Sequence, residues 1–374
     1  MLVDPWHFIA ETSQNETLGL LKKWKKDHPG CAVLAMVTVG DMESVKVLQE
    51  DCRKVGIGLL GGVFPSVIVS SQVYGKGVLL FRMDSMPKYV LTGNVDVAKT
   101  VDDMADELLL SLRDENKHTL FMLFDAAISN ISSLLDQCYL KVADTVSYVG
   151  GCAGSESFQP IPCLFDSNRF ESNAMLAVLW PKKEEPFMRH GYMTPDNHIT
   201  ATSSSKNCIY SIEWRPAFDV YRELALSEYG MTITKENFYS VGAKFPFGIV
   251  RGCGEVLVRI PVALCDDGSL CCSGEIPENS MLTLLQSSEQ DLMRGAVDFT
   301  QDLSASELSA GLIFYCAGRA MFLGEEKVRN ELNVLSQAHG PVFGMMTLGE
   351  IGCTDDGSYP VLHNAAIAYC PKPG

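Results

Sequence analysis

The fold of this chain is decided by a glycine-rich stretch, Val149-Gly150-Gly151-Cys152-Ala153-Gly154-Ser155. It continues an apolar run that begins at Val146, and this run predicts a buried strand. Because glycine has no side chain, it lets a neighbouring backbone or a ligand approach the strand closely. The stretch therefore predicts either a binding pocket or tight packing at the end of this strand.

The same arrangement recurs, which predicts that the chain repeats one unit three times. In each unit an apolar strand and a helix precede a glycine-rich strand, and a further apolar strand follows. These elements are expected at 32–39, 43–55, 58–65 and 77–83 in the first unit, 119–124, 130–140, 146–155 and 173–180 in the second, and 311–316, 325–338, 340–350 and 363–370 in the third. Repeated strand-helix-strand-strand units predict an α/β protein of mixed α+β type, with mixed sheets flanked by helices. The strand order stays open, because the units could share one sheet or form two stacked sheets.

A chain of 374 residues is long for one hydrophobic core, so two domains are expected. Residues 1–30 are predicted to be a peripheral segment, 31–236 the first domain and 237–374 the second. The boundary follows a helix that begins after Pro216 and ends at Gly230.

The charge balance argues against two classes of partner. The formal net charge is −16, and no run of lysine or arginine occurs. Nucleic acids and anionic membranes attract clustered positive charge, so neither is an expected partner. The chain also contains no apolar run long enough to span a bilayer.

The cysteines and the amino terminus predict a cytoplasmic protein. The 13 cysteines are scattered, mostly within apolar strands, and the first residues show no secretion signal. We therefore expect a reduced compartment and free thiols in the core. No Cys-x-x-Cys pair occurs, which argues against a structural zinc site.

No common catalytic motif is present. The sequence has no zinc-protease helix, no Walker phosphate loop and no nucleophile elbow. Gly56-x-Gly58-x-x-Gly61 matches a dinucleotide pattern, but it follows a helix and leads into extended chain instead of opening a helix. We expect no enzyme, although Cys152 in its glycine turn is a conceivable nucleophile.

Among the histidines, His190 is the candidate cofactor ligand. It lies between apolar strands, beside Gly191, with Tyr192 and Met193 close by. A neutral imidazole there could ligate a metal or haem iron, or it could be hydrogen-bonded inside a turn between strands. Cys370, before Pro371, is a weaker candidate for haem iron, and its alternative is a cysteine that ends a strand.

Two charged residues stand at strand ends in apolar surroundings. Arg319 follows one strand of the third unit, and Glu350 follows the glycine-rich strand of the same unit. Charges in such places need partners. Arg319 and Glu350 could bind a polar ligand, or they could form an ion pair with each other.

These motifs, in this order and spacing, resemble the FIST family of sensory proteins. The amino-terminal half of the resemblance lies in Gly150-Gly151-Cys152-Ala153-Gly154, His190-Gly191 and Arg215-Pro216-Ala217 through Tyr221. The carboxy-terminal half lies in Pro246-Phe247-Gly248, Arg251, Cys316-Ala317-Gly318-Arg319, Phe343-Gly344 and Gly349-Glu350-Ile351-Gly352. Gly61-Gly62-Val63-Phe64-Pro65 is similar to a pattern of the stand-alone bacterial members.

The resemblance implies a small-ligand sensor in histidine-kinase or cyclic-di-nucleotide signalling. One branch of the family binds haem b and senses nitric oxide, so the resemblance implies a haem, with His190 as the candidate ligand, and a partner histidine kinase. The alternative is a module that binds an amino acid or similar metabolite. Its expected ligand-binding residues are Gly150, Gly151, Cys152, Arg319 and Glu350. An oligomer is possible under either interpretation.

Overall fold

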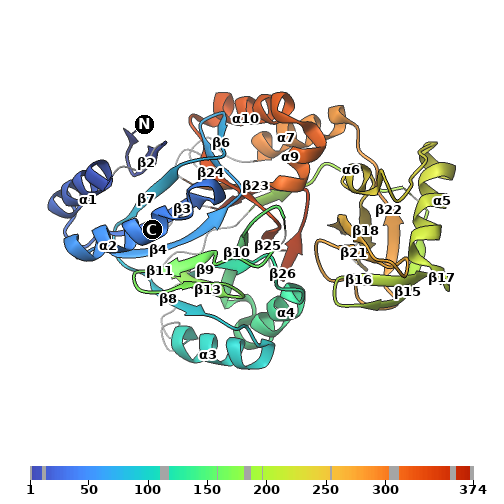
Figure 1. The fold of residues 1–374 in the computed structure, drawn as a ribbon, viewed down its shortest axis with the longest axis horizontal. Coiled ribbons are helices and arrows are strands. Elements are labelled where there is room, and N and C mark those ends of the chain that lie inside the picture. Colours follow the sequence, from blue (N-terminus) through green and yellow to red (C-terminus); the bar gives the residue numbers. More distant parts are fainter. Residues whose placement is uncertain are drawn as a thin grey trace.

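A computed structural model shows that the chain combines helices with mixed sheets (Figure 1). The structure describes residues 2–10, 14–109, 118–157, 159–180, 187–195, 197–252, 255–302, 311–353 and 359–370. The expected mixed α+β class is confirmed. No helix in these ranges is long and apolar enough to cross a membrane.

The three predicted units are present, with boundaries close to those expected. The first comprises β3 (Ala32–Thr38), α2 (Ser44–Val55), β4 (Gly58–Phe64) and β7 (Val78–Met83). The second comprises β9 (His118–Asp125), α4 (Ile131–Val142), β10 (Val146–Ala153) and β13 (Met175–Trp180). The third comprises β23 (Leu312–Cys316), α10 (Glu325–His339), β24 (Phe343–Thr347) and β27 (Ile367–Cys370). In each unit the first and second strands pair in parallel, and the last strand pairs antiparallel to the first.

Each unit is the centre of a larger repeat with two further elements before it. These are β2 (Trp6–Ile9) and α1 (Gln14–Asp27), then β8 (Lys88–Thr92) and α3 (Val97–Leu109), then β14 (Phe187–Arg189) and α7 (Glu289–Asp302). The early strand pairs with the last strand of its own repeat in all three cases. Most of the segment 1–30, expected to be peripheral, is therefore the start of the first repeat.

The three sheets exchange hairpins in a cycle. In each repeat the strand after the glycine-rich strand starts a short hairpin that joins the sheet of another repeat. The hairpins are β5 (Val67–Val69) with β6 (Gln72–Tyr74), β11 (Leu164–Asp166) with β12 (Phe170–Glu171), and β25 (Glu350–Cys353) with β26 (Pro360–His363). Strand β5 pairs with β24, β11 with β4, and β25 with β10. The result is a core of three separate sheets related by pseudo-threefold symmetry, with helices on their outer faces (Figure 1).

The three glycine-rich strands meet where the sheets converge. Backbone hydrogen bonds join them directly: Gly154 N donates to Val63 O, and Leu348 N donates to Cys152 O. By the same symmetry the third donor would be residue 65, but it is a proline and has no N–H. Large side chains fill the space between the sheets, including Phe121, which contacts both Trp180 and Phe314.

One glycine of each central strand has no room for a side chain. A Cβ on Gly150 would lie 1.7 Å from Met122 O, one on Gly344 would lie 1.9 Å from Ile313 O, and one on Gly61 would lie 2.2 Å from Ala35 O. The three glycines occupy equivalent positions, each facing the parallel first strand of its unit. Tight packing, one of the two expected roles of the glycine-rich stretch, therefore applies at this position of each strand.

The third repeat contains an inserted domain between β14 and α7. It is an eight-stranded antiparallel sheet, here called the inserted sheet, together with α5 (Ala217–Tyr229) and α6 (Phe238–Gly242) at one end of the molecule (Figure 1). Its strands are β15 (Ile199–Ser205), β16 (Cys208–Ile212), β17 (Arg215–Pro216), β18 (Phe247–Val250), β19 (Val256–Arg259), β20 (Pro261–Leu264), β21 (Leu270–Cys272) and β22 (Met281–Leu284). The expected hairpin around Asp266-Asp267-Gly268 joins β20 to β21.

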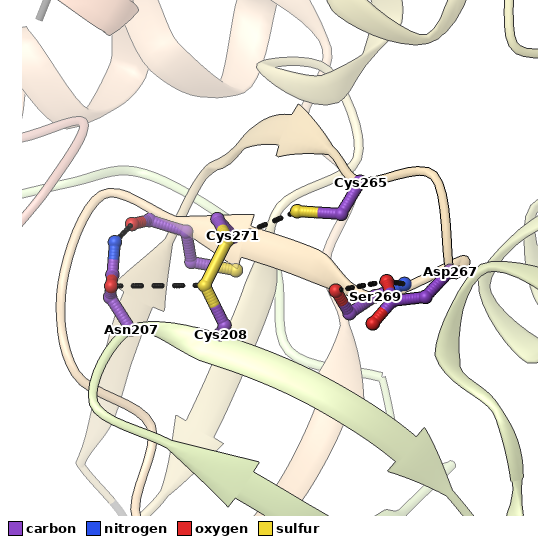
Figure 2. The surroundings of a disulfide bond; sticks show 7 residues. Asn207, Cys208, Cys265, Asp267, Ser269 and Cys271 are labelled. Carbon is purple, nitrogen blue, oxygen red and sulfur yellow. Dashed lines mark hydrogen bonds between the residues drawn. A yellow bond between two sulfur atoms is a disulfide. The ribbon is translucent and has the colours of Figure 1, made fainter.

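The inserted sheet contains a disulfide that the sequence analysis did not anticipate. Cys208 and Cys271 are cross-strand partners on β16 and β21, and they form a disulfide bond (Figure 2). The expectation of free thiols is therefore wrong for these two residues. Their register brings the two sulfurs together although the residues lie 63 positions apart. The other cysteines of the described ranges are free, and most of them are buried as expected.

We expect alanine at any of the three equivalent glycines to destabilise the protein severely. Because a Cβ would collide with a carbonyl oxygen of the neighbouring strand, Gly150→Ala, Gly344→Ala and Gly61→Ala should each lower the free energy of unfolding by roughly 3 kcal/mol or more. Urea denaturation measures the change. Gly19→Ala is the control, because nothing surrounds its Cβ position in exposed helix α1, and it should stabilise by about 0.5–1 kcal/mol. Equal effects at all four glycines would contradict the close packing.

Candidate functional site

Two adjoining cavities lie between the threefold core and the inserted sheet, and we call them together the core–sheet cleft. The smaller has a volume of about 50 Å³ and the larger about 250 Å³. Val262 and Ser273 from the inserted sheet and Leu348 from the core line both. The walls therefore come from two bodies that are joined by the crossover between β14 and β15.

Asn364 is the most unusual residue of the cleft. It lines the smaller cavity, its side chain is only 1% exposed, and neither its Oδ1 nor its Nδ2 has a hydrogen-bond partner in the described structure. A buried amide without partners costs on the order of 1–3 kcal/mol, so such groups in folded proteins call for an explanation. A polar molecule bound in the cavity would provide the missing partners.

The turn that carries Asn364 is held firmly in place. It joins β26 to β27, and the next residue, Ala365, has a positive φ of 58°. Ala365 N donates to the Cys316 sulfur at 3.1 Å, and its carbonyl accepts from Arg319. A left-handed backbone at a residue other than glycine is unfavourable and persists only where its surroundings fix it. The contacts of Cys316 and Arg319 therefore hold the backbone beside the Asn364 amide.

Two buried thiols flank the cleft. Cys316 lines the smaller cavity and Cys152 the larger. Burial raises the pKa of both thiols well above the usual range. A neutral thiol is a poor nucleophile, so these residues are weak hydrogen-bond donors in this state and do not form a reactive centre.

Glu350 links the glycine-rich strand to the Asn364 turn. It is the cross-strand partner of Gly151, its Oε1 accepts from Thr347 Oγ1 at 2.7 Å, and its Oε2 accepts from Ala366 N at 3.3 Å. Burial raises its pKa to about 8. The equivalent positions in the other exchanged hairpins are Val67 and Leu164, both apolar. Packing in this position therefore does not demand a carboxyl group.

Arg319 lies on the other side of this turn, facing the helices outside the core. Its guanidinium forms a buried ion pair with Glu331 of α10, with Nη2 at 2.7 Å from Oε1 and Nε at 3.0 Å from Oε2. It also donates to the carbonyls of His190, at 2.6 Å, and of Leu292, at 2.8 Å. The expected ion pair between Arg319 and Glu350 is therefore wrong, because helix α9 (Ala317–Leu323) directs the arginine toward α10.

His190 lies in the crossover from the core to the inserted sheet. Its Nδ1 accepts a hydrogen bond from Tyr192 N at 3.0 Å, as in the hydrogen-bonded turn that was its alternative role. Neither cavity of the core–sheet cleft has His190 in its wall, and the described ranges contain no group of three or more residues that could hold a metal ion. The arrangement at His190 thus does not fit a haem site, and we derive no chemistry from one.

The predicted site residues separate into two groups. Gly150, Gly151, Cys152 and Glu350 come together on the paired strands β10 and β25, next to the cleft. Arg319 and His190 contact each other on the outer side. Sequence reasoning missed Asn364, because an asparagine after a strand is an ordinary turn residue and nothing in the pattern marks it.

We expect the Glu350 carboxyl to impose a pH dependence on stability. The folded protein holds the proton up to pH about 8, whereas the unfolded chain releases it near 4.5. The folded state therefore binds more protons in this window, and the free energy of unfolding should fall as pH rises from 4.5 to 8. Urea titrations of the wild type and Glu350→Gln should differ by an amount that changes by a few kcal/mol across this window, on the order of 1.4 kcal/mol per pKa unit.

The control for this experiment is Glu278→Gln, which changes an exposed carboxyl in a turn. Its pH profile should parallel that of the wild type. A Glu350→Gln profile that also runs parallel to the wild type would show that the Glu350 proton is not retained in the folded protein.

Comparison with known proteins gives one clear result. The family model described as the FIST N domain matches residues 8–215, and the model described as the FIST C domain matches residues 217–353. No curated protein matches the chain. The two models meet inside the inserted domain, so each covers part of that domain and part of the threefold core. The chain therefore belongs to the FIST family, whose domains are sensory modules of signal transduction.

Proposed function

We propose that this protein is a sensor that binds a small polar metabolite in the core–sheet cleft. The observation that carries the proposal is the Asn364 amide, which is buried, has no hydrogen-bond partner and faces a cavity. A ligand that satisfies this amide gains hydrogen bonds without displacing any that the protein already makes.

The size and polarity of the cleft favour a ligand smaller than a drug molecule. Pockets for drug-sized ligands span roughly 300–1,000 Å³, whereas these cavities have volumes of about 50 and 250 Å³. The amide of Asn364 offers both a donor and an acceptor. The charged residues in the walls are Glu156 and Glu275, which disfavour an anionic ligand. An amino acid or its amide fits this combination best.

Binding in this place can be transmitted because the walls belong to two bodies. A ligand that bridges Asn364 of the core and Ser273 of the inserted sheet favours the arrangement in which both are in reach. It thereby shifts the population toward that arrangement. A partner that contacts both bodies would respond to the shift. A histidine kinase or a cyclic-di-nucleotide enzyme as that partner stays a prediction from the family resemblance.

Replacing Asn364 by leucine should separate ligand binding from stability. The variant loses the unpaired amide, so its melting temperature should equal or exceed that of the wild type. A thermal-shift screen with the standard amino acids and their amides should find a compound that raises the melting temperature of the wild type but not of Asn364→Leu.

The matched control is Asn330→Leu, on the exposed side of α10. This variant should keep the full ligand-induced shift. A compound that shifts Asn364→Leu as much as the wild type would place its site elsewhere. If no amino acid or amide shifts the wild type, this ligand class is wrong.

Haem b and nitric oxide sensing stay predictions, implied by the family resemblance alone. Their test is an absorption spectrum of protein purified from cells supplied with a haem precursor. Bound haem would give a Soret band that remains after desalting and shifts with nitric oxide, and His190→Ala would remove it if His190 were the ligand. A featureless spectrum would exclude the haem sensor and leave the metabolite sensor.

A further inference from the structure

A third cysteine lies against the disulfide of the inserted sheet. The sulfur of Cys265 is 3.7 Å from the sulfur of Cys271, which is bonded to Cys208. Figure 2 shows that Cys265 points at Cys271 from the side away from Cys208. Since Cys271 has no sulfhydryl hydrogen in the disulfide, the hydrogen between the two sulfurs belongs to Cys265.

The backbone around Cys265 fixes this approach. Cys265 N donates to Ser269 O, and Gly268 N donates to Cys265 O, so hydrogen bonds close the turn between β20 and β21. Asp267 Oδ1 accepts from both the backbone N and the hydroxyl of Ser269 within this turn (Figure 2). A thiol held in line with a disulfide reacts at a far higher effective concentration than one in solution.

The three sulfurs are also accessible, unlike most thiols of this chain. Cys208, Cys265 and Cys271 are each partly exposed. Among the free cysteines of the described ranges, only Cys265 and Cys353 are not buried. Reagents and small thiols in solution can therefore reach this cluster, whereas burial excludes them from residues such as Cys152 and Cys316.

We propose that Cys208, Cys265 and Cys271 form a thiol–disulfide exchange site in which the disulfide moves from Cys208–Cys271 to Cys265–Cys271. Cys265 gives its proton to solvent, and its thiolate forms a bond to the Cys271 sulfur. The bond from Cys271 to Cys208 breaks, and its electron pair stays on Cys208, which takes up a proton. The step needs no oxidant or reductant, because one disulfide and one thiol are present before and after.

The exchange changes which strands are covalently joined. Before it, the disulfide ties β16 to β21 across 63 positions of the chain. After it, the bond lies within the hairpin of β20 and β21, and β16 is released. Asn207, next to Cys208, donates to Cys272 O and lines the larger cavity together with Cys271. The exchange therefore alters a wall of the core–sheet cleft, although the proposal does not depend on the identity of any ligand.

The test maps the disulfide directly. The protein is equilibrated in buffers that span a range of reduced-to-oxidised glutathione ratios, quenched with acid, and alkylated with N-ethylmaleimide. A protease that cleaves before aspartate then separates Cys265 from Cys271, because Asp266 and Asp267 stand between them. Mass spectrometry identifies the linked peptides, and fragment ions distinguish Cys271 from the adjacent Cys272.

We expect two linked species in the wild type, Cys208–Cys271 and Cys265–Cys271, with Cys208 alkylated in the second. Cys265→Ser should show only the first species and Cys208→Ser only the second. Cys353→Ser is the matched control, since it removes the other partly exposed thiol and should leave both species unchanged. If Cys265 is fully alkylated in every buffer, in both the wild type and Cys208→Ser, the proposal is overturned. The wild-type result decides the matter even if a variant fails to fold.

Discussion

The close approach of backbones at Gly61, Gly150 and Gly344 is the constraint on which the rest of the structure depends. At these positions a parallel neighbour occupies the space of a side chain, which lets three sheets converge on one axis. Because the sheets converge, each exchanged hairpin can reach the sheet of another repeat and bury both of its faces. The helices then cover the outer faces, as the apolar residues of α2 and α4 require.

The candidate site arises where the pseudo-threefold symmetry is broken. The third repeat alone carries the inserted domain, and it places Glu350 where the other repeats have Val67 and Leu164. Proline at residue 65 removes one of the three backbone links around the axis. Buried polar groups are expensive, so a polar group that replaces an apolar one in a repeated environment is better explained by function than by packing. Arg319 adds to this asymmetry, because it joins the Asn364 turn to the crossover and to α7.

The sequence was sufficient to predict the repeated units, because each unit is local. Strand, helix, glycine-rich strand and final strand follow one another within about 50 residues, and their periodicities are visible in the chain. The exchange of hairpins could not be predicted, since β5, β11 and β25 look alike in sequence whichever sheet they join. The disulfide was missed for the same reason, because the pairing of Cys208 with Cys271 depends on the register of strands far apart in the sequence. For the site, the glycine stretch predicted the position of Cys152 and Glu350 beside the cleft, whereas the partner of Arg319 and the exposure of the Asn364 amide to a cavity depend on tertiary packing.

The exchanged hairpins also determine how the chain can be synthesised and folded. The sheet of the first repeat gains its edge only when Leu164–Asp166 has left the ribosome, and that of the second only when Glu350–His363 has followed. No repeat can be excised as an autonomous domain, because each would lack one hairpin and leave another without a sheet. Contacts between such distant segments slow folding and expose unpaired strand edges on the way. The nascent chain therefore depends on protection of those edges until its last strands have been made.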